Sequence, residues 1–205
     1  MLRDLDPSRP DTSRRLLSLL DDAGAPYRLI RHAPEGRTDL ASALRGHPLR
    51  QAAKCLVVRV GTGRRSRRYV LAVVPGDRRV DMRRVRELYG GTDAAFAARE
   101  VAERLSGCVS GCVVPFTFHP DLDLVVDPGL LRHDDIYFNA ARLDLSIALP
   151  VPAYVALARP RTAVLTTPVG PDRPLAGAVA GAAGPAAVSV LGTGSGSGRG
   201  EGPRP

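Results

Sequence analysis

The chain has 205 residues, of which 44% are apolar and 24% charged, the composition of a soluble globular protein with room for one domain. Its 29 Lys and Arg residues outnumber 21 Asp and Glu residues, and the net charge of +8 favours a polyanionic partner and excludes an acidic protein mimic. Three Cys residues exclude a disulfide scaffold, and the N-terminus lacks the apolar stretch of a secretory signal, so we expect a cytoplasmic protein.

The first predicted elements are two short helices separated by a strand. Leu16, Leu17 and Leu20 share one face of a helix that ends at Gly24. Residues 27–31 favour a short strand. Residues 39–45 favour a second short helix, which ends at the glycine that follows it.

A β-hairpin and two amphipathic helices are predicted next. Residues 55–60 and 69–74 are two β-branched runs joined by a turn rich in Gly and Arg, which is typical of a hairpin. Met82, Val85 and Leu88 mark a helix that ends at a pair of glycines. A further helix carries Val101 and Leu105 and ends at the next glycine.

The last predicted elements are four strands over residues 113–118, 122–126, 136–139 and 145–149, followed by a helix near residues 152–158. Short turns join these strands. The order of elements therefore predicts one α+β domain with a mixed, mostly antiparallel sheet. We place this domain at residues 11–160, after a flexible N-terminus at residues 1–10.

The C-terminal segment, residues 161–205, has a different composition. It contains 10 of the 21 Gly residues and six Pro residues, and it ends in GTGSGSGRGEGPRP. Such a segment buries too little apolar area to offset its ordering entropy, so we expect a disordered tail. Its uncharged stretch, residues 175–192, has few large side chains and a central proline, which argues against a membrane anchor.

The basic charge is concentrated between residues 59 and 86, where ten Arg residues face only two acidic residues. This excess equals the net charge of the whole chain. Four of these residues fall in the predicted hairpin loop: Arg64, Arg65, Arg67 and Arg68. The loop is either a solvated surface or a clamp that binds nucleic-acid phosphates without reading bases.

Lys54 is the only lysine of the chain, whereas the other 28 basic residues are Arg. A single lysine in such a composition suggests a position that needs a compact ammonium group rather than a planar guanidinium. Lys54 also stands where the predicted hairpin begins. Composition alone leaves open that it is an ordinary surface residue.

The second candidate site is the segment Gly107-Cys-Val-Ser-Gly111-Cys-Val-Val-Pro115, between a predicted helix and strand. Glycine here lets backbone N–H groups approach a ligand oxyanion, because it tolerates unusual dihedral angles and has no side chain. The alternative is a helix-stopping glycine followed by a bulged strand.

Cysteine and metal chemistry are weaker alternatives. Cys108 and Cys112 with His119 lack the paired spacing of a zinc site, and small buried cysteines are common. A cysteine nucleophile assisted by His119 or His133 is a further alternative, although no sequence pattern pairs a cysteine with either histidine. We therefore expect no metal and no cofactor.

Three blocks in order carry a family resemblance: QAAKCLVV at residues 51–58, LSGC through GCVVPF at residues 105–116, and IYFNA at residues 136–140 with Ser146 after it. Together they resemble the YbaK family of aminoacyl-tRNA editing domains, which is related to the domain inserted in bacterial prolyl-tRNA synthetases. The PFTFHP and FNA runs are most similar to the free-standing, YeaK-like branch. The resemblance spans about residues 27–160.

The resemblance implies hydrolysis of the ester that joins a wrong amino acid to the terminal ribose of tRNA. It implies a sheet curled into a partly open barrel with surrounding helices. Lys54 and Gly111 are then the expected catalytic residues, and Lys54 is expected to position either the phosphate of the terminal adenosine or the substrate carbonyl, without acting as a nucleophile. The expected substrate-binding residues are Cys112, Val113, Val114, Pro115, Asn139, Ala140 and Ser146. Asn139 and Ser146 depart from the cysteine-editing branch, which has Ser and Asp there, so we do not expect a cysteine-specific reaction.

The sequence thus predicts a deacylase that acts in trans on mischarged tRNA, with Ser first and then Thr or Ala as the amino acid removed. We expect Asn139 to hydrogen-bond the substrate hydroxyl. We expect the Arg loop to hold the acceptor end of tRNA. We expect the protein to bind no membrane and to need no obligate protein partner. An inactive tRNA- or ribosome-binding module on the same fold is the alternative, and a cysteine- or metal-dependent hydrolase is a third reading.

Overall fold

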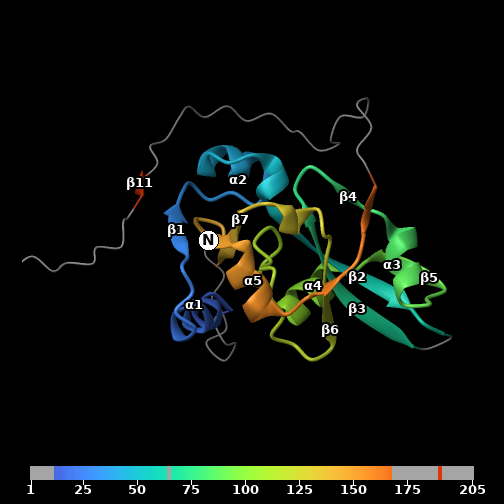
Figure 1. Cartoon of the computed structure of the whole chain (residues 1–205). Coiled ribbons are helices and arrows are strands. Elements are labelled where there is room, and N and C mark those ends of the chain that lie inside the picture. The colour runs from blue at the N-terminus through green and yellow to red at the C-terminus, as the bar shows by residue number, and fades with distance from the viewer. Residues whose placement is uncertain (1–11, 64–65, 168–188, 191–205) are drawn as a thin grey trace, which may run out of the picture.

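A computed structural model of the chain describes residues 12–63, 66–167 and 189–190 (Figure 1). Its helices are α1 (Thr12–Asp22), α2 (Thr38–Arg45), α3 (Met82–Leu88), α4 (Arg99–Ser106) and α5 (Val151–Ala158). Two short 3₁₀ turns, η1 (Leu49–Gln51) and η2 (Leu130–Arg132), lie between them. All five helices correspond to predicted ones.

The strands form three sheets. The strands of the first sheet, in order across it, are β5 (Asp93–Phe96), β2 (Ala53–Gly61), β3 (Arg67–Pro75), β6 (Leu122–Val126) and β9 (Arg161–Thr162). The strands of the second sheet, in order across it, are β11 (Ser189–Val190), β1 (Arg28–Arg31), β8 (Leu145–Pro150) and β7 (Asp135–Arg142). The third pairs β10 (Thr166–Thr167) with β4 (Arg79–Val80). Among the strand pairs of the described residues, only β3–β6 and β6–β9 are parallel, which confirms a mixed, mostly antiparallel α+β fold. Closure into a partly open barrel stays a prediction.

Strand β3 separates two apolar cores, because both of its faces are buried. Leu71 and Val73 belong to the larger core, which α1, α5 and the second sheet complete. Val70, Ala72 and Val74 point to the opposite face and join a smaller core beneath α3. This alternation is the normal period of a strand, and burial on both faces explains why β3 is almost continuously apolar.

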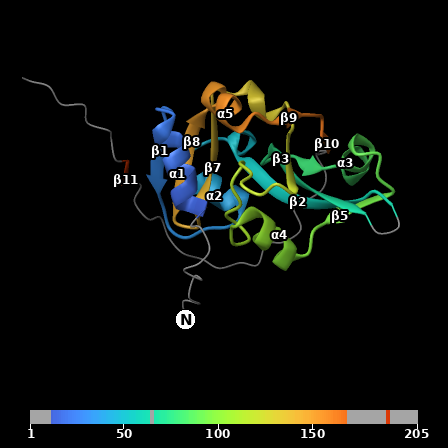
Figure 2. The same ribbon diagram turned by 90° about the horizontal axis from the view of Figure 1, so that it is seen from below.

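Glycines end the helices that position the site. Gly46 follows α2 with a φ of 69°, and Gly107 follows α4 with a φ of 68°, a conformation that glycine adopts without strain. In both views of the ribbon, α1 lies at one end of the molecule and α3 with β5 lies at the other (Figures 1 and 2). The predicted hairpin is the β2–β3 pair, whose register runs from Ala53–Pro75 to Gly61–Arg67.

One predicted strand is wrong. Residues 113–118 form an irregular segment with no strand pairing. It packs against α5 and β7 instead. The hydroxyl of Tyr154 donates to the Pro115 carbonyl at 2.9 Å, and the Phe116 ring packs edge-on against Tyr154 and at a tilt against Phe138. Apolar residues here are buried by tertiary packing, which an alternating pattern does not distinguish from a strand. Conversely, the Ala-rich edge strand β5 was not predicted.

The predicted tail, residues 161–205, includes a segment that is part of the fold. Residues 161–167 include β9 and β10, and Leu165 between them is completely buried in the smaller core. The buried carboxylate of Asp127 fixes this segment by accepting hydrogen bonds from the Leu165 N–H and the Thr166 hydroxyl. A truncation at residue 161 would therefore remove part of the core. Residues 1–11 and the rest of the tail, apart from β11, lie outside the described residues.

Candidate active site

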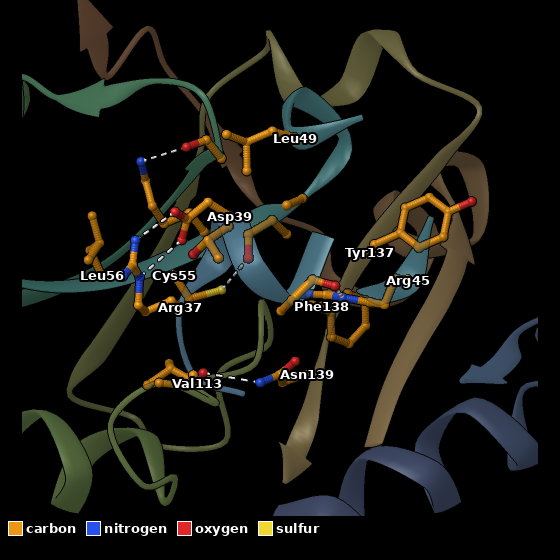
Figure 3. A pocket seen from close by; sticks show the side chains of 18 residues that line it. Arg37, Asp39, Arg45, Leu49, Cys55, Leu56, Val113, Tyr137, Phe138 and Asn139 are labelled. Atoms are coloured by element: carbon orange, nitrogen blue, oxygen red, sulfur yellow. Dashed lines mark hydrogen bonds and ion pairs between the residues drawn. The ribbon is translucent and has the colours of Figure 1, made fainter. Parts of the chain in front are cut away.

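A cavity of about 470 Å³ opens where the start of β2 meets α2, β7 and the loop that follows α4. Figure 3 shows Arg37 and Asp39 on one side of it and Arg45 and Tyr137 on the other. Four of the predicted site residues line this cavity: Lys54, Gly111, Val113 and Asn139. Three separate sequence blocks thus supply its wall.

The other predicted substrate-binding residues do not line the cavity. Cys112, Val114, Pro115, Ala140 and Ser146 are buried behind its wall, and Ser146 is completely inaccessible to solvent. Their neighbours in the same segments line the cavity. The sequence did not separate side chains that face this cavity from those that face the core.

The ammonium group of Lys54 is held by the turn that follows β3. It donates to the carbonyl of Gly76 at 3.0 Å and to the carbonyl of Arg78. Burial lowers the pKa of Lys54, Asp77 opposes that shift, and Arg79 adds to it. Because an ammonium has three N–H donors, these two bonds leave one for a ligand.

Gly76 brings this turn close to η1 and α2. A Cβ atom at Gly76 would lie 2.5 Å from the carbonyl oxygen of Leu49 and 3.0 Å from a methyl group of Thr38. Any larger residue would push the turn away, and the carbonyl that accepts from Lys54 would move with it. Gly76 lines the cavity itself, yet the sequence analysis did not single it out.

Gly111 contacts the opposite loop through its backbone. Its φ is 95°, which favours glycine, and a Cβ atom here would lie 3.0 Å from the Cα atom of Gly36. Among the described residues, the Gly111 N–H has no hydrogen-bond acceptor. Gly111 thus lines the cavity with an N–H that has no acceptor in the described part of the chain, which makes it a candidate donor for an oxyanion.

The side chain of Asn139 ties the two loops together. Its Nδ2 group donates to the carbonyls of Glu35 at 3.0 Å and Gly111 at 3.2 Å. Its Oδ1 atom accepts from the hydroxyl of Ser146 at 3.0 Å, and that hydroxyl also lies 2.7 Å from Nε2 of His32. Both N–H groups of Asn139 are thus occupied, so only a lone pair on Oδ1 remains for a substrate hydroxyl.

The charges that line the cavity are predominantly positive. Arg37 and Asp39 form an ion pair at 2.8 Å. Burial by itself raises the pKa of Asp39, but hydrogen bonds from Arg37 and the Leu40 N–H outweigh burial and lower it. No carboxylate of the described residues forms an ion pair with Lys54 or Arg45. The cavity therefore suits an anionic ligand.

The sequence profile of the aminoacyl-tRNA editing domain matches residues 33–157, which include all three blocks of the site. The chain belongs to the aminoacyl-tRNA editing domain family. This editing domain is 39% identical over 150 residues to the multifunctional Ser/Thr-tRNA deacylase ProXp-y of Escherichia coli K12. That match covers 73% of this chain and 89% of the relative, and the protein of the same name from E. coli O157:H7 matches equally.

Solved structures share the fold of the editing domain. The crystal structure of a hypothetical protein has a TM-score of 0.67 and 24% identity, and the match covers 75% of this chain and 99% of that one. A protein described as a candidate trans-editing enzyme for prolyl-tRNA synthetase has a TM-score of 0.64 and 22% identity, with 80% and 99% coverage. At these identities the likeness shows the fold alone.

The thiols of the editing domain are poorly suited to nucleophilic chemistry. Cys108 and Cys112 are buried and unpaired, and burial raises the pKa of both, that of Cys112 to about 12. A thiol with so high a pKa is scarcely ionised at neutral pH. Within the part of the chain that the structure describes, no three His, Cys, Asp or Glu residues lie together in a way that could hold a metal ion.

A second hollow of about 510 Å³ lies at the far end of β3 from Lys54. Arg67, Arg68, Arg104 and His119 line it, together with two aspartates. Arg64 and Arg65, which were predicted to bind tRNA with them, lie outside the described residues. The cavity at Lys54 and the basic hollow at Arg67 are therefore two separate sites on the structure.

Proposed function

We propose that this editing domain is a deacylase that acts in trans on mischarged tRNA and removes a small amino acid. The observation that carries the proposal is one cavity lined by Lys54, Gly111 and Asn139, each from a different sequence block. The identity to relatives named as Ser/Thr-tRNA deacylases supports the same reaction. We assign the catalytic roles to Lys54 and Gly111.

The reaction breaks the bond between the carbonyl carbon of the amino acid and the ribose oxygen of the tRNA end. A water oxygen bonds to that carbon, and the carbonyl oxygen becomes negatively charged. The Gly111 N–H and the third N–H of Lys54 are the donors that we assign to this oxyanion. One such donor is worth about 10²–10³ in rate. The ribose oxygen then leaves with the proton that the water gives up.

A small amino acid suits the cavity, whose lining also includes Val113 and Thr38. We propose Ser as the first substrate, followed by Thr and Ala. The remaining lone pair on Oδ1 of Asn139 would accept the substrate hydroxyl. A site that hydrogen-bonds a substrate hydroxyl strongly rejects an analogue that lacks this hydroxyl. An apolar pocket distinguishes two substrates that differ by one methylene by only about 1–3 kcal/mol.

The function is tested by measuring deacylation of tRNA charged with Ser, Thr, Ala or Cys. We expect seryl esters to be hydrolysed fastest and cysteinyl esters slowly. An inactive tRNA-binding module would bind these substrates without releasing the amino acid faster than buffer does. Rapid hydrolysis of cysteinyl-tRNA in preference to seryl-tRNA would contradict the proposed specificity, and no hydrolysis at all would contradict the proposed function.

Binding of the tRNA backbone is assigned to the basic hollow at Arg67 and Arg68. Most arginines of residues 59–86 have acidic partners; Arg83, Arg84 and Arg86, for example, form ion pairs with Asp81 or Glu87 around α3. Arg67 has no ion pair among the described residues, Arg68 pairs with Asp123 at 3.7 Å, and both line the basic hollow together with Arg104. The gathering of these cations in one hollow, with Arg67 unpaired, supports the assignment.

We predict that replacing Arg67 and Arg68 with Ala weakens binding of all tRNAs alike. The slope of log K against log salt should become shallower by up to about 0.9 for each phosphate that the variant no longer neutralises. Fluorescence anisotropy with tRNA over a range of salt concentrations measures that slope. The control variant replaces Arg83 and Arg86, which removes the same charge from paired positions on α3. Equal slopes in the wild type and the Arg67/Arg68 variant would show that the hollow does not bind phosphates.

We also propose a cytoplasmic location, because three unpaired cysteines suit a reducing compartment. No helix in the described ranges is both long and apolar enough to cross a membrane. The expected absence of an obligate protein partner remains a proposal.

A further inference from the structure

Arg45 is a cation of the cavity that the proposed reaction does not use. It is the last residue of α2, lines the cavity and is half-buried. Its Nε group donates to the Ala41 carbonyl at 2.8 Å. Its Nη1 atom is enclosed by protein and has no hydrogen-bond partner among the described residues. The guanidinium is thus held in place by its own helix but is incompletely satisfied.

The charge of Arg45 is not compensated by its surroundings. Burial lowers its pKa to about 10, so the side chain is still protonated at neutral pH. The adjacent His47 does not add or remove charge there, since burial lowers the pKa of His47 to about 4. Leaving a buried or half-buried charge without an opposite charge destabilises a fold. An anionic ligand in the cavity would compensate this charge.

The substrate of the proposed reaction restricts what that ligand can be. In an aminoacyl ester the carboxyl group is esterified and carries no charge, so the amino acid cannot supply the anion. The nearest negative group of an aminoacylated RNA end is the phosphate on the 5′ side of the terminal nucleoside. A guanidinium fits phosphate oxygens well, because its N–H groups form a planar fork.

An aromatic surface lies beside Arg45 and suits the rest of a nucleotide. The ring of Tyr137 lines the cavity and stacks on His47 with the ring centres 3.9 Å apart and the planes 13° apart. Figure 3 shows Tyr137 and Arg45 on the same side of the cavity. Aromatic rings next to a cation are the combination by which proteins bind unpaired nucleotides.

We propose that Arg45 binds the 5′-phosphate of the terminal nucleotide, with Tyr137 beside the nucleoside. This inference rests on the proposed function, because it takes the tRNA end as the ligand of the cavity. It gives separate roles to the two lining cations that have no ion pair among the described residues: Lys54 acts at the ester, and Arg45 holds the phosphate. Arg45 is therefore a binding residue for the RNA end, whatever amino acid is attached.

The test uses two stable analogues in which an amide replaces the ester: 3′-seryl-amino-3′-deoxyadenosine with and without a 5′-phosphate. Calorimetry with the full chain should show that the phosphate strengthens binding by about 10- to 100-fold, as expected for charge-assisted hydrogen bonds. Arg45→Gln should abolish this difference, and Arg45→Lys should keep part of it. The control is Arg50→Gln, which removes an exposed charge five positions later and should keep the full difference.

A third probe, 5′-AMP, separates the phosphate site from the proposed function. Binding of 5′-AMP that depends on Arg45, without binding of either seryl analogue, would leave the phosphate site standing and contradict the deacylase. Equal binding of the two seryl analogues, or an undiminished difference in Arg45→Gln, would overturn the phosphate site and leave the deacylase standing. No binding of any probe would overturn both. Thermal unfolding of each variant confirms that it is folded.

Discussion

Replacing Lys54 with Met should reduce deacylation of seryl-tRNA by at least about 10²–10³, the value of one oxyanion donor. The variant loses the N–H that we assign to the ester carbonyl and also the bonds that fix the turn at Gly76. Lys54→Arg should fail nearly as badly, because a guanidinium is larger than an ammonium and its rigid planar fork directs its N–H groups differently from the three rotatable donors of Lys54. Single-turnover rates with seryl-tRNA measure both effects.

The matched control is Arg79→Met, which removes an exposed charge close enough to affect the pKa of Lys54. This variant should keep a nearly normal rate. All three proteins should remain folded, because Lys54 lies near the start of its strand and outside both cores. Lys54→Met should unfold at a somewhat lower temperature, because it loses the bonds to the turn. Near-normal turnover by Lys54→Arg would show that any cation suffices. It would contradict the inference that we drew from Lys54 being the single lysine of the chain.

Replacing Gly111 with Ala should lower the rate by about 10² or more, mainly through kcat. The added Cβ would lie 3.0 Å from Gly36 Cα, so the two loops would have to separate. The φ of 95° is also unfavourable for alanine. Both changes displace the N–H that we assign to the oxyanion, while Arg45 and the nucleotide side of the cavity stay in place.

Gly24→Ala is the control for backbone strain alone. Gly24 also has a positive φ, of 59°, but a Cβ atom there would meet nothing within 4 Å. It should cost stability, by about 1 kcal/mol, without affecting the rate. Steady-state kinetics and urea unfolding of both variants separate the two effects. A Gly111→Ala protein with an unchanged kcat would exclude the loop from the chemistry.

The parts of the fold that could be predicted are those set by local sequence. The β2–β3 hairpin combines β-branched runs with a turn rich in Gly and Arg, and α2 and α4 end at glycines that adopt positive φ. Residues 113–118 were misassigned because their apolar residues are buried against Tyr154 rather than in a ladder. Burial by distant residues leaves no periodic signal.

The site was predictable to the extent that composition marks it. Lys54 is conspicuous as the single lysine, and Gly111 as part of a glycine-spaced loop. Arg45 and His32 carry no such signal, since one is among 28 arginines and the other is an isolated histidine. Only the fold brings Arg45 to the cavity and His32 to the hydroxyl of Ser146.

Asn139 shows a different limit. Its residue type predicted a hydrogen bond to the substrate hydroxyl. The structure directs both of its N–H groups to the carbonyls of Glu35 and Gly111, so its main role is to hold two loops together. A sequence identifies a donor, but the assignment of its acceptors depends on the loops that surround it.

The most direct test of the proposed active site is a crystal structure of the full chain with the phosphorylated seryl analogue bound. We expect the seryl carbonyl oxygen to lie about 2.7–3.1 Å from both the backbone nitrogen of Gly111 and Nζ of Lys54. The 5′-phosphate should lie against the guanidinium of Arg45. An analogue bound outside this cavity, or inside it with its carbonyl directed away from Lys54 and Gly111, would contradict the proposed active site.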